Sequence, residues 1–342
     1  MLAFVGENMI GRIKVTPHGQ TPSGLTPHES LSRLIKEETT ALVQHYLGAR
    51  LHESGVSGGF MKFLAKSPTN NEDPLNKNGS RPTLALNDWI VKLNDDDHPH
   101  IVLLEYFGMV AARAAGLTVP DVHLSQDRQH ILIQRFDVIS PNESIGFEDF
   151  CALFGLPARD KFTGSVERLI KTIGTYCQGE KKRHSFDRFF GQYVLASTIR
   201  NGDAHLKNFG LMYNNAETVE LAPLYNMLSM AVYAPTLPNT RDANDGMAIN
   251  FQGSKRWLSP DTIQSLSAQC LMTEKRVDEW KTQIAAALIE TSEKVIDYLH
   301  KHPEDKFDSI ADRMLELWAI GLETFDRKAS QHISNNRPRL ER

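Results

Sequence analysis

Hydrophobic positions in the first 140 residues alternate between helical and strand-like spacing. Apolar residues recur with helical spacing over residues 26–48 and again over 100–117, where Gly116 is placed to end the helix. Three shorter apolar segments have the spacing of strands, the last of them as two strands joined by a polar turn: residues 61–67, 88–94 and 122–139. This part of the chain is predicted to mix sheet and helix.

Beyond residue 136 the pattern becomes mostly helical. Helical spacing is found in five segments: residues 147–156, 164–174, 185–200, 273–300 and 304–333. Strand spacing is found only around residues 208–223. A sheet-rich part followed by a helix-rich part favours an α+β chain of two lobes over alternating strand and helix units. We expect an N-lobe at residues 1–136 and a helical C-lobe at residues 137–342.

Composition and charge exclude several classes of protein. With 342 residues, 41% hydrophobic content and a net charge of -4, the chain is typical of a soluble globular protein and not of one that coats nucleic acid. The three cysteines, Cys151, Cys177 and Cys270, match neither a disulfide framework nor a zinc site. No segment reaches the roughly 18 apolar residues of a membrane span, and the N-terminus does not read as a signal peptide. We expect a cytoplasmic protein without direct nucleic-acid or membrane binding.

The segment "RNGDAHLKNFGLMYN", residues 200–214, carries the candidate chemistry. It follows the predicted helix 185–200, which should end near Gly202, and it precedes a predicted strand. Protein kinases use an Asp that accepts the proton of the substrate hydroxyl and an Asn five residues later that holds magnesium. Asp203 and Asn208 have this interval, although a solvated loop can have it by chance. A loop held between a helix and a strand presents such groups rigidly.

Two other polar residues of this loop have alternative interpretations. His205 could orient Asp203 through a hydrogen bond, or it could brace the loop against the core. Lys207 could neutralise charge on the transferring phosphoryl group, or it could be a surface lysine.

Two segments of the N-terminal part are suited to a triphosphate. "SGVSGGF", residues 54–60, can supply backbone amides to phosphate oxygens, although a tight turn before a strand is an equal alternative. Lys92 lies inside the apolar segment "DWIVKLN", where an unpaired ammonium group would be costly. Glu105 on the following helix is its candidate ion-pair partner. The competing interpretation is an edge-strand lysine that faces solvent.

These motifs together resemble the HipA-like serine/threonine kinases, which are toxins of bacterial toxin–antitoxin modules. The resemblance runs from about residue 50 to 260 and is carried by "VSGGFMK", "IVKLN", "IQRFD", "NGDAHLKNFGL" and "LAPLYNM". It implies a two-lobed, kinase-like fold, the use of ATP and Mg²⁺, and phosphorylation of a serine on a translation protein such as an aminoacyl-tRNA synthetase.

The resemblance also assigns roles to individual residues. It makes Asp203 the catalytic acid, with His205 and Lys207 beside it, and Asn208 a magnesium ligand. Lys92 would contact the nucleotide phosphates. The other nucleotide-binding positions would be Ser54, Val56, Ser57, Gly58 and Gly59 in the Gly-rich loop, and Gln134, Arg135 and Phe136 at the hinge beside the adenine. Members of the family phosphorylate a serine of their own Gly-rich loop, a position that Ser57 matches, with Ser54 as a second candidate.

The chain departs from the full-length family pattern at its N-terminus. Only about 50 residues precede the Gly-rich loop. The chain therefore resembles the short, HipT-like form, in which an additional N-terminal subdomain is absent or encoded as a separate protein. This implies a HipS-like or HipB-like antitoxin as a partner.

A second departure concerns the metal site. In "LAPLYNM", Asn226 occupies the position at which the family has an Asp. That Asp corresponds to the D-F-G Asp of kinases, which is the second magnesium ligand beside the Asn of the catalytic loop. An amide keeps the shape of the carboxylate but lacks its charge, so magnesium binding and turnover should weaken. Three explanations are open: an engineered inactive variant, which we favour, a natural pseudokinase, or a weakly active enzyme.

Two other functions remain as alternatives. Small-molecule kinases of the aminoglycoside or choline type have a catalytic loop close to "NGDAHLKN", but their second metal motif does not fit "PLYNM". A pseudokinase or binding module that acts by occupancy is supported by Asn226.

Overall fold

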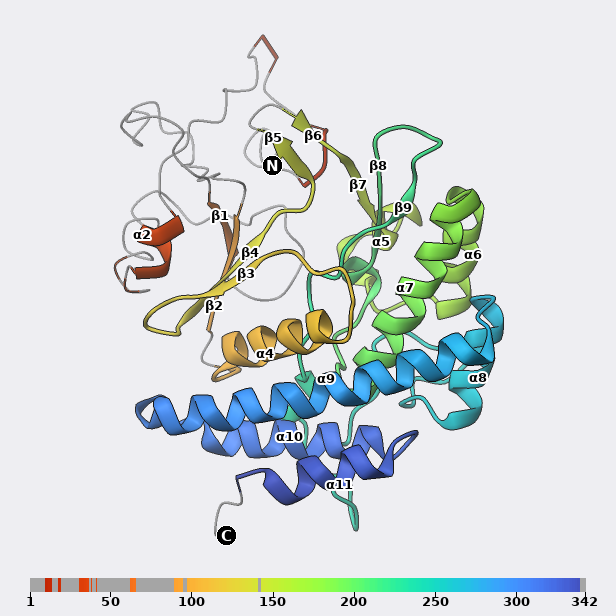
Figure 1. The fold of residues 1–342 in the computed structure, drawn as a ribbon. Helices are drawn as coiled ribbons and strands as arrows, with labels where there is room; N and C mark the ends of the chain where they lie inside the picture. The colour runs from red at the N-terminus through yellow and green to blue at the C-terminus, as the bar shows by residue number, and fades with distance from the viewer. Residues whose placement is uncertain are drawn as a thin grey trace. The chain divides into compact units, whose positions relative to one another are not determined.

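The computed structural model describes residues 10–13, 18–19, 31–36, 38, 41, 62–65, 89–94, 97–140 and 143–338. The chain divides into two compact units (Figure 1). Unit 1 takes in Met1–Val102, Pro120–Glu148 and Met212–Asn214, and unit 2 takes in Leu103–Val119, Asp149–Leu211 and Asn215–Arg342. The lobe boundary expected at residue 136 stays a prediction.

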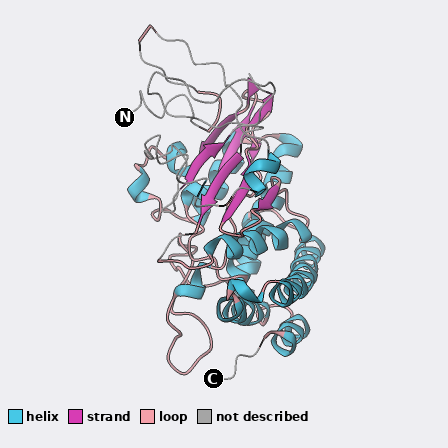
Figure 2. Ribbon diagram, turned by 90° about the vertical axis from the view of Figure 1, so that its left-hand side faces the viewer, coloured by secondary structure: helices cyan, strands magenta, loops and turns pink. Residues whose placement is uncertain are grey.

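Unit 1 contains a four-stranded antiparallel sheet, whose strands are drawn in magenta in Figure 2. Its order is β1-β2-β4-β3. The strands are β1 (Lys62–Ala65), β2 (Trp89–Leu93), β3 (Val122–Leu124) and β4 (His130–Gln134). They confirm the strands predicted within residues 61–67, 88–94 and 122–139.

Helix α2 (Leu31–Lys36) covers one face of this sheet. Leu34 packs against the alternate residues of β2 that point to this face, Trp89, Val91 and Leu93. The Gln126 N–H donates to the carbonyl of Ile35 at 2.6 Å, which ties the helix to the turn between β3 and β4. Most of the predicted helix 26–48 lies outside the described residues. Because successive side chains of a strand alternate, the opposite face of β2 carries Ile90 and Lys92.

Five short strands form two smaller sheets. An antiparallel pair consists of β5 (Val138–Ser140) and β6 (Glu143–Ser144). The other sheet has the order β7-β8-β9, with β7 (Gly146–Asp149), β8 (Gly210–Tyr213) and β9 (Glu220–Leu221). Strands β8 and β9 confirm the prediction around residues 208–223.

The sequence-based prediction missed β6 and β7 and joined β5 to β4 in a single strand, and the expectation that strands beyond residue 136 occur only around 208–223 is wrong. Strands β6 and β7 have the sequences ES and GFED, in which no apolar and polar residues alternate, so no strand pattern marks them. The helix predicted at residues 147–156 is also wrong at its start, because α5 (Phe150–Leu153) begins only after Asp149. The Asp149 carboxylate accepts the N–H of Ala152 at 2.8 Å and so fixes this helix start.

Unit 2 is mainly helical. Its longer helices are α4 (Ile101–Ala114), α6 (Val166–Tyr176), α7 (Gly179–Thr198), α8 (Pro260–Gln269), α9 (Glu274–Lys301), α10 (Asp308–Leu322) and α11 (Arg327–Asn336). Short 3-10 helices are η2 (Ala158–Asp160), η3 (Leu206–Asn208), η4 (Met230–Tyr233) and η5 (Pro303–Asp305). Among the described residues, no helix combines the length and apolar character that a membrane span requires.

Most of the predicted helices are confirmed. Helix α4 ends as expected at Gly116, which has a φ of +83°, and the Leu117 N–H donates back to the carbonyl of Ala112 at 3.1 Å. The predicted stretch 304–333 is divided into α10 and α11, because the carboxylate of Asp326 accepts the Ala329 N–H and starts a new helix. Helix α8 was not predicted.

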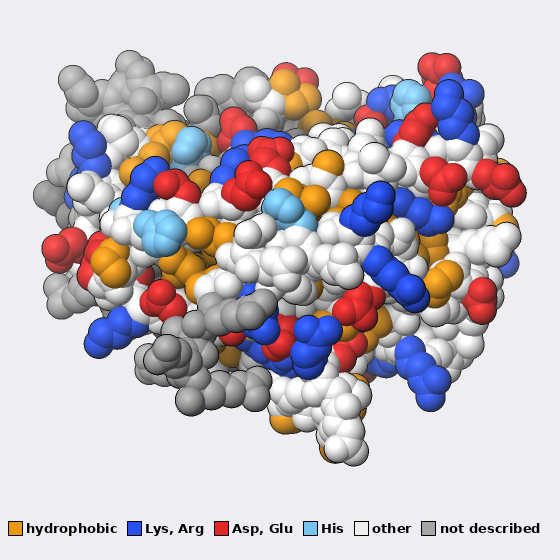
Figure 3. Space-filling model, turned by 60° about the horizontal axis from the view of Figure 1, so that its bottom comes forward, with side chains coloured by type: hydrophobic (Ala, Val, Ile, Leu, Met, Phe, Trp, Pro, Cys, Tyr) orange, Lys and Arg blue, Asp and Glu red, His pale blue; other side chains and the backbone are white. Residues whose placement is uncertain are grey.

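Helices α9, α10 and α11 lie side by side (Figure 1). On the face in Figure 3, acidic and basic side chains are interspersed, with hydrophobic side chains between them. Many charged residues of α9 form pairs along the helix, such as Lys301 with Asp297 at 2.7 Å. Gly321 of α10 approaches the end of α7 so closely that a Cβ there would lie 1.9 Å from the carbonyl oxygen of Thr198. The end of α7 is therefore fixed by backbone packing.

Candidate active site

The candidate catalytic loop begins with a turn at the end of α7. The helix ends at Thr198 and not near Gly202 as predicted. Arg200 has a φ of +60°, and the amides of Arg200 and Asn201 donate to carbonyls of the last helical turn at 3.2 and 2.8 Å. This is a Schellman motif with an arginine in the left-handed position that glycine usually occupies. The turn directs the next residues away from the helix axis.

Asp203 is the accessible carboxylate of this loop. Its side chain is 20% exposed, while the preceding Asn201 is fully buried. The Asn201 side-chain oxygen accepts the Asp203 N–H at 3.2 Å, and its side-chain nitrogen contacts the sulfur of Met227 at 3.7 Å. A buried amide thus fixes the backbone of Asp203, while the carboxylate stays accessible.

His205 is buried beside Asp203. Its ring is 1% exposed, and its Nε2 lies 3.6 Å from the Asp203 Oδ1. The ring of Phe162 meets it edge to face, with a centroid distance of 5.2 Å. The packing on Phe162 agrees with a bracing role, whereas the 3.6 Å separation from Asp203 is too long for the hydrogen bond of the orienting interpretation.

Asn208 is fixed relative to His205 by two hydrogen bonds. The Asn208 Oδ1 accepts the His205 N–H at 3.0 Å, and the Asn208 N–H donates to the carbonyl of His205 at 2.9 Å. The Oδ1 retains a second lone pair that a cation could use. Strand β8 begins two residues later, so the loop is held at both ends.

Lys207 is not a surface lysine. Its side chain is 18% exposed, and its Nζ lies 2.5 Å from the Oδ2 of Asp149, a residue that the sequence did not single out. The Tyr225 hydroxyl donates to the backbone carbonyl of Lys207 at 2.6 Å. Burial raises the pKa of Tyr225 well above its usual value, and the Asp149 charge adds to this. The phenol therefore stays a hydrogen-bond donor at any physiological pH.

The residues on either side of Asn226 are anchored. Tyr225 is tied to Lys207, and Gly108 of α4 packs on the Met227 carbonyl so closely that a Cβ would lie 2.1 Å from the oxygen. The indole N–H of Trp318 donates to the Ser229 hydroxyl at 2.7 Å. Asn226 is partly exposed between these anchors. The structure thus ties the residue next to Asn226 to the loop of Asp203 and Asn208.

The polar groups of this region fit a divalent cation poorly. Asn208 and Asn226 offer neutral amide oxygens, and Asp203 supplies one carboxylate. Within the described residues, no group of three or more His, Cys, Asp or Glu side chains could hold a metal ion. Magnesium favours carboxylate and phosphate oxygens. An Asp at position 226 would supply a second negative charge.

In unit 1, Lys92 is buried. It is 5% exposed and belongs to β2, a central strand of the four-stranded sheet, so it is not an edge lysine facing solvent. Glu105, on α4, is 4% exposed. Since the two residues belong to different units, their ion pair stays a prediction.

The predicted adenine hinge lies at the end of β4. Arg135 is buried, and its Nε and Nη2 donate to the two carboxylate oxygens of Asp137 at 2.9 and 2.5 Å. The ring of Phe136 packs edge to face on Phe147 at 5.2 Å, and the Gln134 N–H donates to a neighbouring backbone carbonyl. Arg135 therefore has a structural partner, whatever its relation to a nucleotide.

The predicted Gly-rich loop is not described. Ser54, Val56, Ser57, Gly58 and Gly59 all lie outside the described residues. Their nucleotide-binding and autophosphorylation roles stay predictions.

A third acidic residue beside the loop was also missed. The carboxylate of Asp245 packs on Gly202, where a Cβ would lie 2.1 Å from its Oδ2. Burial raises the pKa of Asp245, although the N–H of Gly246 partly offsets this. No sequence pattern connects these positions, which are 43 residues apart.

Comparison with known proteins identifies the family. The chain matches the family model described as the HipA-like C-terminal domain over residues 54–295, and it belongs to this family. The protein named "Putative kinase Y4dM" of Sinorhizobium fredii is 30% identical over 205 residues, which cover 55% of this chain and 47% of that protein. "Putative kinase Y4mE" of the same organism is 27% identical over 39% of this chain and 34% of that protein. The chain thus spans less than half the length of these relatives.

A solved structure confirms the fold class. HipA of the Shewanella oneidensis MR-1 toxin–antitoxin system, in a complex with HipB and its operator DNA, superposes with a TM-score of 0.64 at 15% identity. The superposition covers 97% of this chain and 79% of HipA. The predicted α+β, HipA-like fold and the predicted family are therefore confirmed. The HipT-like short form stays a prediction.

Proposed function

We propose that this chain is a serine/threonine protein kinase of the HipA type, which transfers the γ-phosphate of ATP to a serine of a protein. The observation that carries this proposal is the geometry of Asp203. Its accessible carboxylate lies on a loop of buried, hydrogen-bonded neighbours, five residues before Asn208. Kinase catalysis consists mainly of positioning and electrostatic stabilisation, for which such a rigid loop is suited.

In this proposal each polar residue has one task. Asp203 accepts the proton of the acceptor hydroxyl, and His205, packed on Phe162, braces the loop beside it. Lys92 contacts the nucleotide phosphates, and Gln134, Arg135 and Phe136 border the adenine.

Lys207 and the two amides supply the electrostatics of the site. Lys207, held by Asp149, contributes positive charge near the transferring group. Asn208 and Asn226 are the positions that would hold the Mg²⁺ accompanying ATP, and Mg²⁺ bound there would offset the phosphate charge. With a neutral amide at position 226, we expect the chain as given to be inactive or weakened.

The substrate and partners follow the resemblance to HipA. We propose a translation protein, such as an aminoacyl-tRNA synthetase, as the acceptor, and Ser57 or Ser54 as sites of autophosphorylation. The complex of the related HipA with HipB supports an antitoxin, HipB-like or HipS-like, as a partner.

Transfer of labelled phosphate from ATP tests the proposal. We would compare the chain as given, Asn226→Asp, and Asn226→Asp combined with Asp203→Ala, with the protein alone and in a bacterial lysate. We expect Asn226→Asp to label itself and a lysate protein, and Asp203→Ala to reduce this by about 10²-fold or more. Mass spectrometry of the labelled bands then identifies the acceptor serines. Undiminished labelling with Asp203→Ala would contradict the assignment of Asp203.

Asn226 also supports a second candidate, a pseudokinase that binds a nucleotide or an antitoxin and acts by occupancy. Calorimetry with ATP separates the two. If Asn226→Asp binds ATP and transfers no phosphate to itself, to a lysate or to small aminoalcohols, the occupancy function is correct.

A further inference from the structure

The residue at the start of the catalytic loop has an unfavourable backbone conformation for its type. Arg200 adopts a left-handed φ of +60° at the end of α7, where a glycine would be free of strain. Its side chain is only 6% exposed. A buried guanidinium group requires partners that satisfy its charge and its donors.

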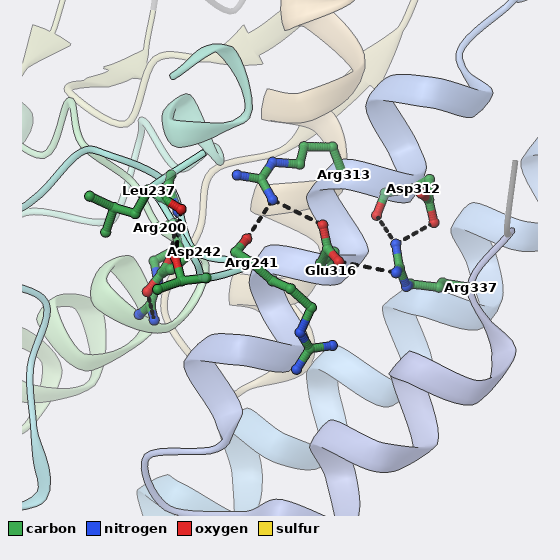
Figure 4. A network of polar contacts seen from close by, with 10 residues as sticks. Arg200, Leu237, Arg241, Asp242, Asp312, Arg313, Glu316 and Arg337 are labelled. Carbon is green, nitrogen blue, oxygen red and sulfur yellow. Dashed lines mark hydrogen bonds and ion pairs between the residues drawn. The ribbon is translucent and has the colours of Figure 1, made fainter. Parts of the chain in front are cut away.

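These partners come from a distant part of the chain. The Nε and Nη2 of Arg200 donate to the two carboxylate oxygens of Asp242 at 3.0 and 2.9 Å (Figure 4). Its Nη1 donates to the carbonyl of Ser197 at 3.0 Å. The guanidinium carbon also lies 5.2 Å from the ring centre of Trp257. A bidentate pair of this kind fixes orientation as well as distance.

Asp242 belongs to a compact segment, residues 235–246, which we call the tethered segment. Its turn is closed by two backbone bonds, from the Leu237 N–H to the carbonyl of Asp242 at 2.9 Å and from the Asn244 N–H to the carbonyl of Pro235 at 2.7 Å. Arg313 of α10 holds the segment from another side, because its Nη1 donates to the carbonyl of Arg241 at 2.6 Å (Figure 4). The segment is thus fixed by two arginines.

The tethered segment brings the carboxylate of Asp245 onto Gly202, the residue before Asp203. A side chain on residue 202 would collide with this carboxylate. The following Gly246 packs on the Lys255 carbonyl, where a Cβ would lie 2.3 Å from the oxygen. The position of the tethered segment therefore determines what surrounds the backbone of Asp203.

The tethered segment follows Asn226, the position that the resemblance to kinases makes the second metal site. In protein kinases the activation loop follows the corresponding position. Many kinases order that loop by phosphorylation, because the new phosphate pairs with an arginine. Here a carboxylate of the chain already forms this pair. We propose that Arg200 is a positioning residue that acts through Asp242 to hold the tethered segment against the catalytic loop, so that no phosphate is needed there. This inference rests on the proposed kinase function.

Hydrogen exchange and kinetics together test the proposal. Arg200→Gly removes the ion pair and also relieves the backbone strain, so a loss of function cannot be due to strain. In the full chain carrying Asn226→Asp, we expect Arg200→Gly to speed amide exchange of residues 235–246 by about tenfold or more. We expect kcat to fall about tenfold, with KM for ATP within about threefold, since a charged hydrogen bond is lost.

Three further measurements make the result specific. Trypsin should cut the chain after Arg241 faster in Arg200→Gly than in the parent protein, because the tethered segment is then held less firmly. The variant Asp242→Asn is unsuitable for this assay, because residue 242 directly follows the bond that trypsin cuts. Arg200→Lys, which keeps the charge without the planar fork, should recover part of kcat. The control Glu323→Gln breaks the more exposed pair with Arg241, 3.2 Å apart, and should leave exchange and kcat unchanged.

Several outcomes would overturn the proposal. These are unchanged exchange and kcat in Arg200→Gly, faster exchange spread evenly over the whole chain, or an active protein that requires phosphate on Thr236 or Thr240 by mass spectrometry. If Asn226→Asp has no kinase activity, the proposed function fails. The exchange data then decide separately whether Arg200 holds the segment.

Discussion

The Lys207 ammonium group lies 2.5 Å from the carboxylate of Asp149, with the two side chains 18% and 13% exposed. The other oxygen of Asp149 accepts the Ala152 N–H at the start of α5. One carboxylate thus joins the candidate catalytic loop to a helix start. Because water reaches this pair poorly, its charges are screened less than those of a surface pair.

We expect this ion pair to contribute measurably to stability. Asp149→Asn keeps an oxygen for the helix cap but removes the charge, so the free energy of unfolding should fall by about 1–2 kcal/mol. A double-mutant cycle with Lys207→Met, measured by urea unfolding, isolates the pair. The more exposed pair of Lys294 and Glu290, 2.7 Å apart, is the control and should give about 0.3–0.5 kcal/mol. Equal coupling for both pairs would contradict the burial argument.

Asp137 should make stability depend on acid pH. Burial by itself raises the pKa of this carboxyl, but the hydrogen bonds and charge of Arg135 and the N–H of Gly11 outweigh it, so the net pKa is lowered from 3.8. A folded-state pKa below the unfolded value gives stability that is fully present above about pH 5 and is lost as the pH falls below about 4. Asp137→Asn should therefore lower the urea midpoint most at neutral pH and least near pH 3.

An exposed acid is the control for this titration. Asp278 is 74% exposed, and Asp278→Asn should change the urea midpoint little at any pH. A constant difference between the native chain and Asp137→Asn from pH 3 to pH 7 would show that the Asp137 charge is not the cause.

The close approach of α10 to α7 predicts a position that tolerates no side chain. Gly321→Ala would place a Cβ 1.9 Å from the Thr198 carbonyl oxygen, so the helices must separate. We expect a loss of about 1–3 kcal/mol, although alanine favours helix over glycine by about 1 kcal/mol. Gly174→Ala on α6 meets side-chain atoms and no backbone, Phe186 at 3.2 Å and Lys182 at 3.6 Å, and should be near neutral. Thermal melting of both variants checks this, and an unharmed Gly321→Ala would show that α10 can move.

The cysteines should be unreactive in the folded protein. Burial raises the pKa of Cys270 to about 12 and raises the pKa values of Cys151 and Cys177 above their usual value. Since only the thiolate reacts, iodoacetamide at pH 8 should label all three quickly in denaturant and slowly without it. Rapid labelling of the native protein would indicate local opening around the modified cysteine.

Strong periodicity made the larger elements predictable from sequence. The predictions for α4 and α9 came from long runs with one period, and a glycine marked the end of α4. Strands β6 and β7 lack an alternation of apolar and polar residues, and β5 follows β4 too closely to be told apart from it. The end of α7 was misplaced because the left-handed residue is Arg200, whereas the prediction assumed a glycine.

The loop of Asp203 and Asn208 was recognisable because its residues are neighbours in the sequence. The contacts that support it were not, since they join residues far apart. Asp149 precedes Lys207 by 58 residues, and Asp242 follows Arg200 by 42. Such pairs depend on how distant segments pack, and no local pattern records them.

The anchoring on both sides of Asn226 has a consequence for how this protein could change. The chain around this position is held by Tyr225, Met227 and Ser229, through contacts that do not involve the Asn226 side chain. The backbone on either side of position 226 is therefore held by contacts of the neighbouring residues. If the proposed kinase function is correct, exchanging Asn and Asp at this one position changes the charge available for phosphoryl transfer while these neighbouring contacts stay in place.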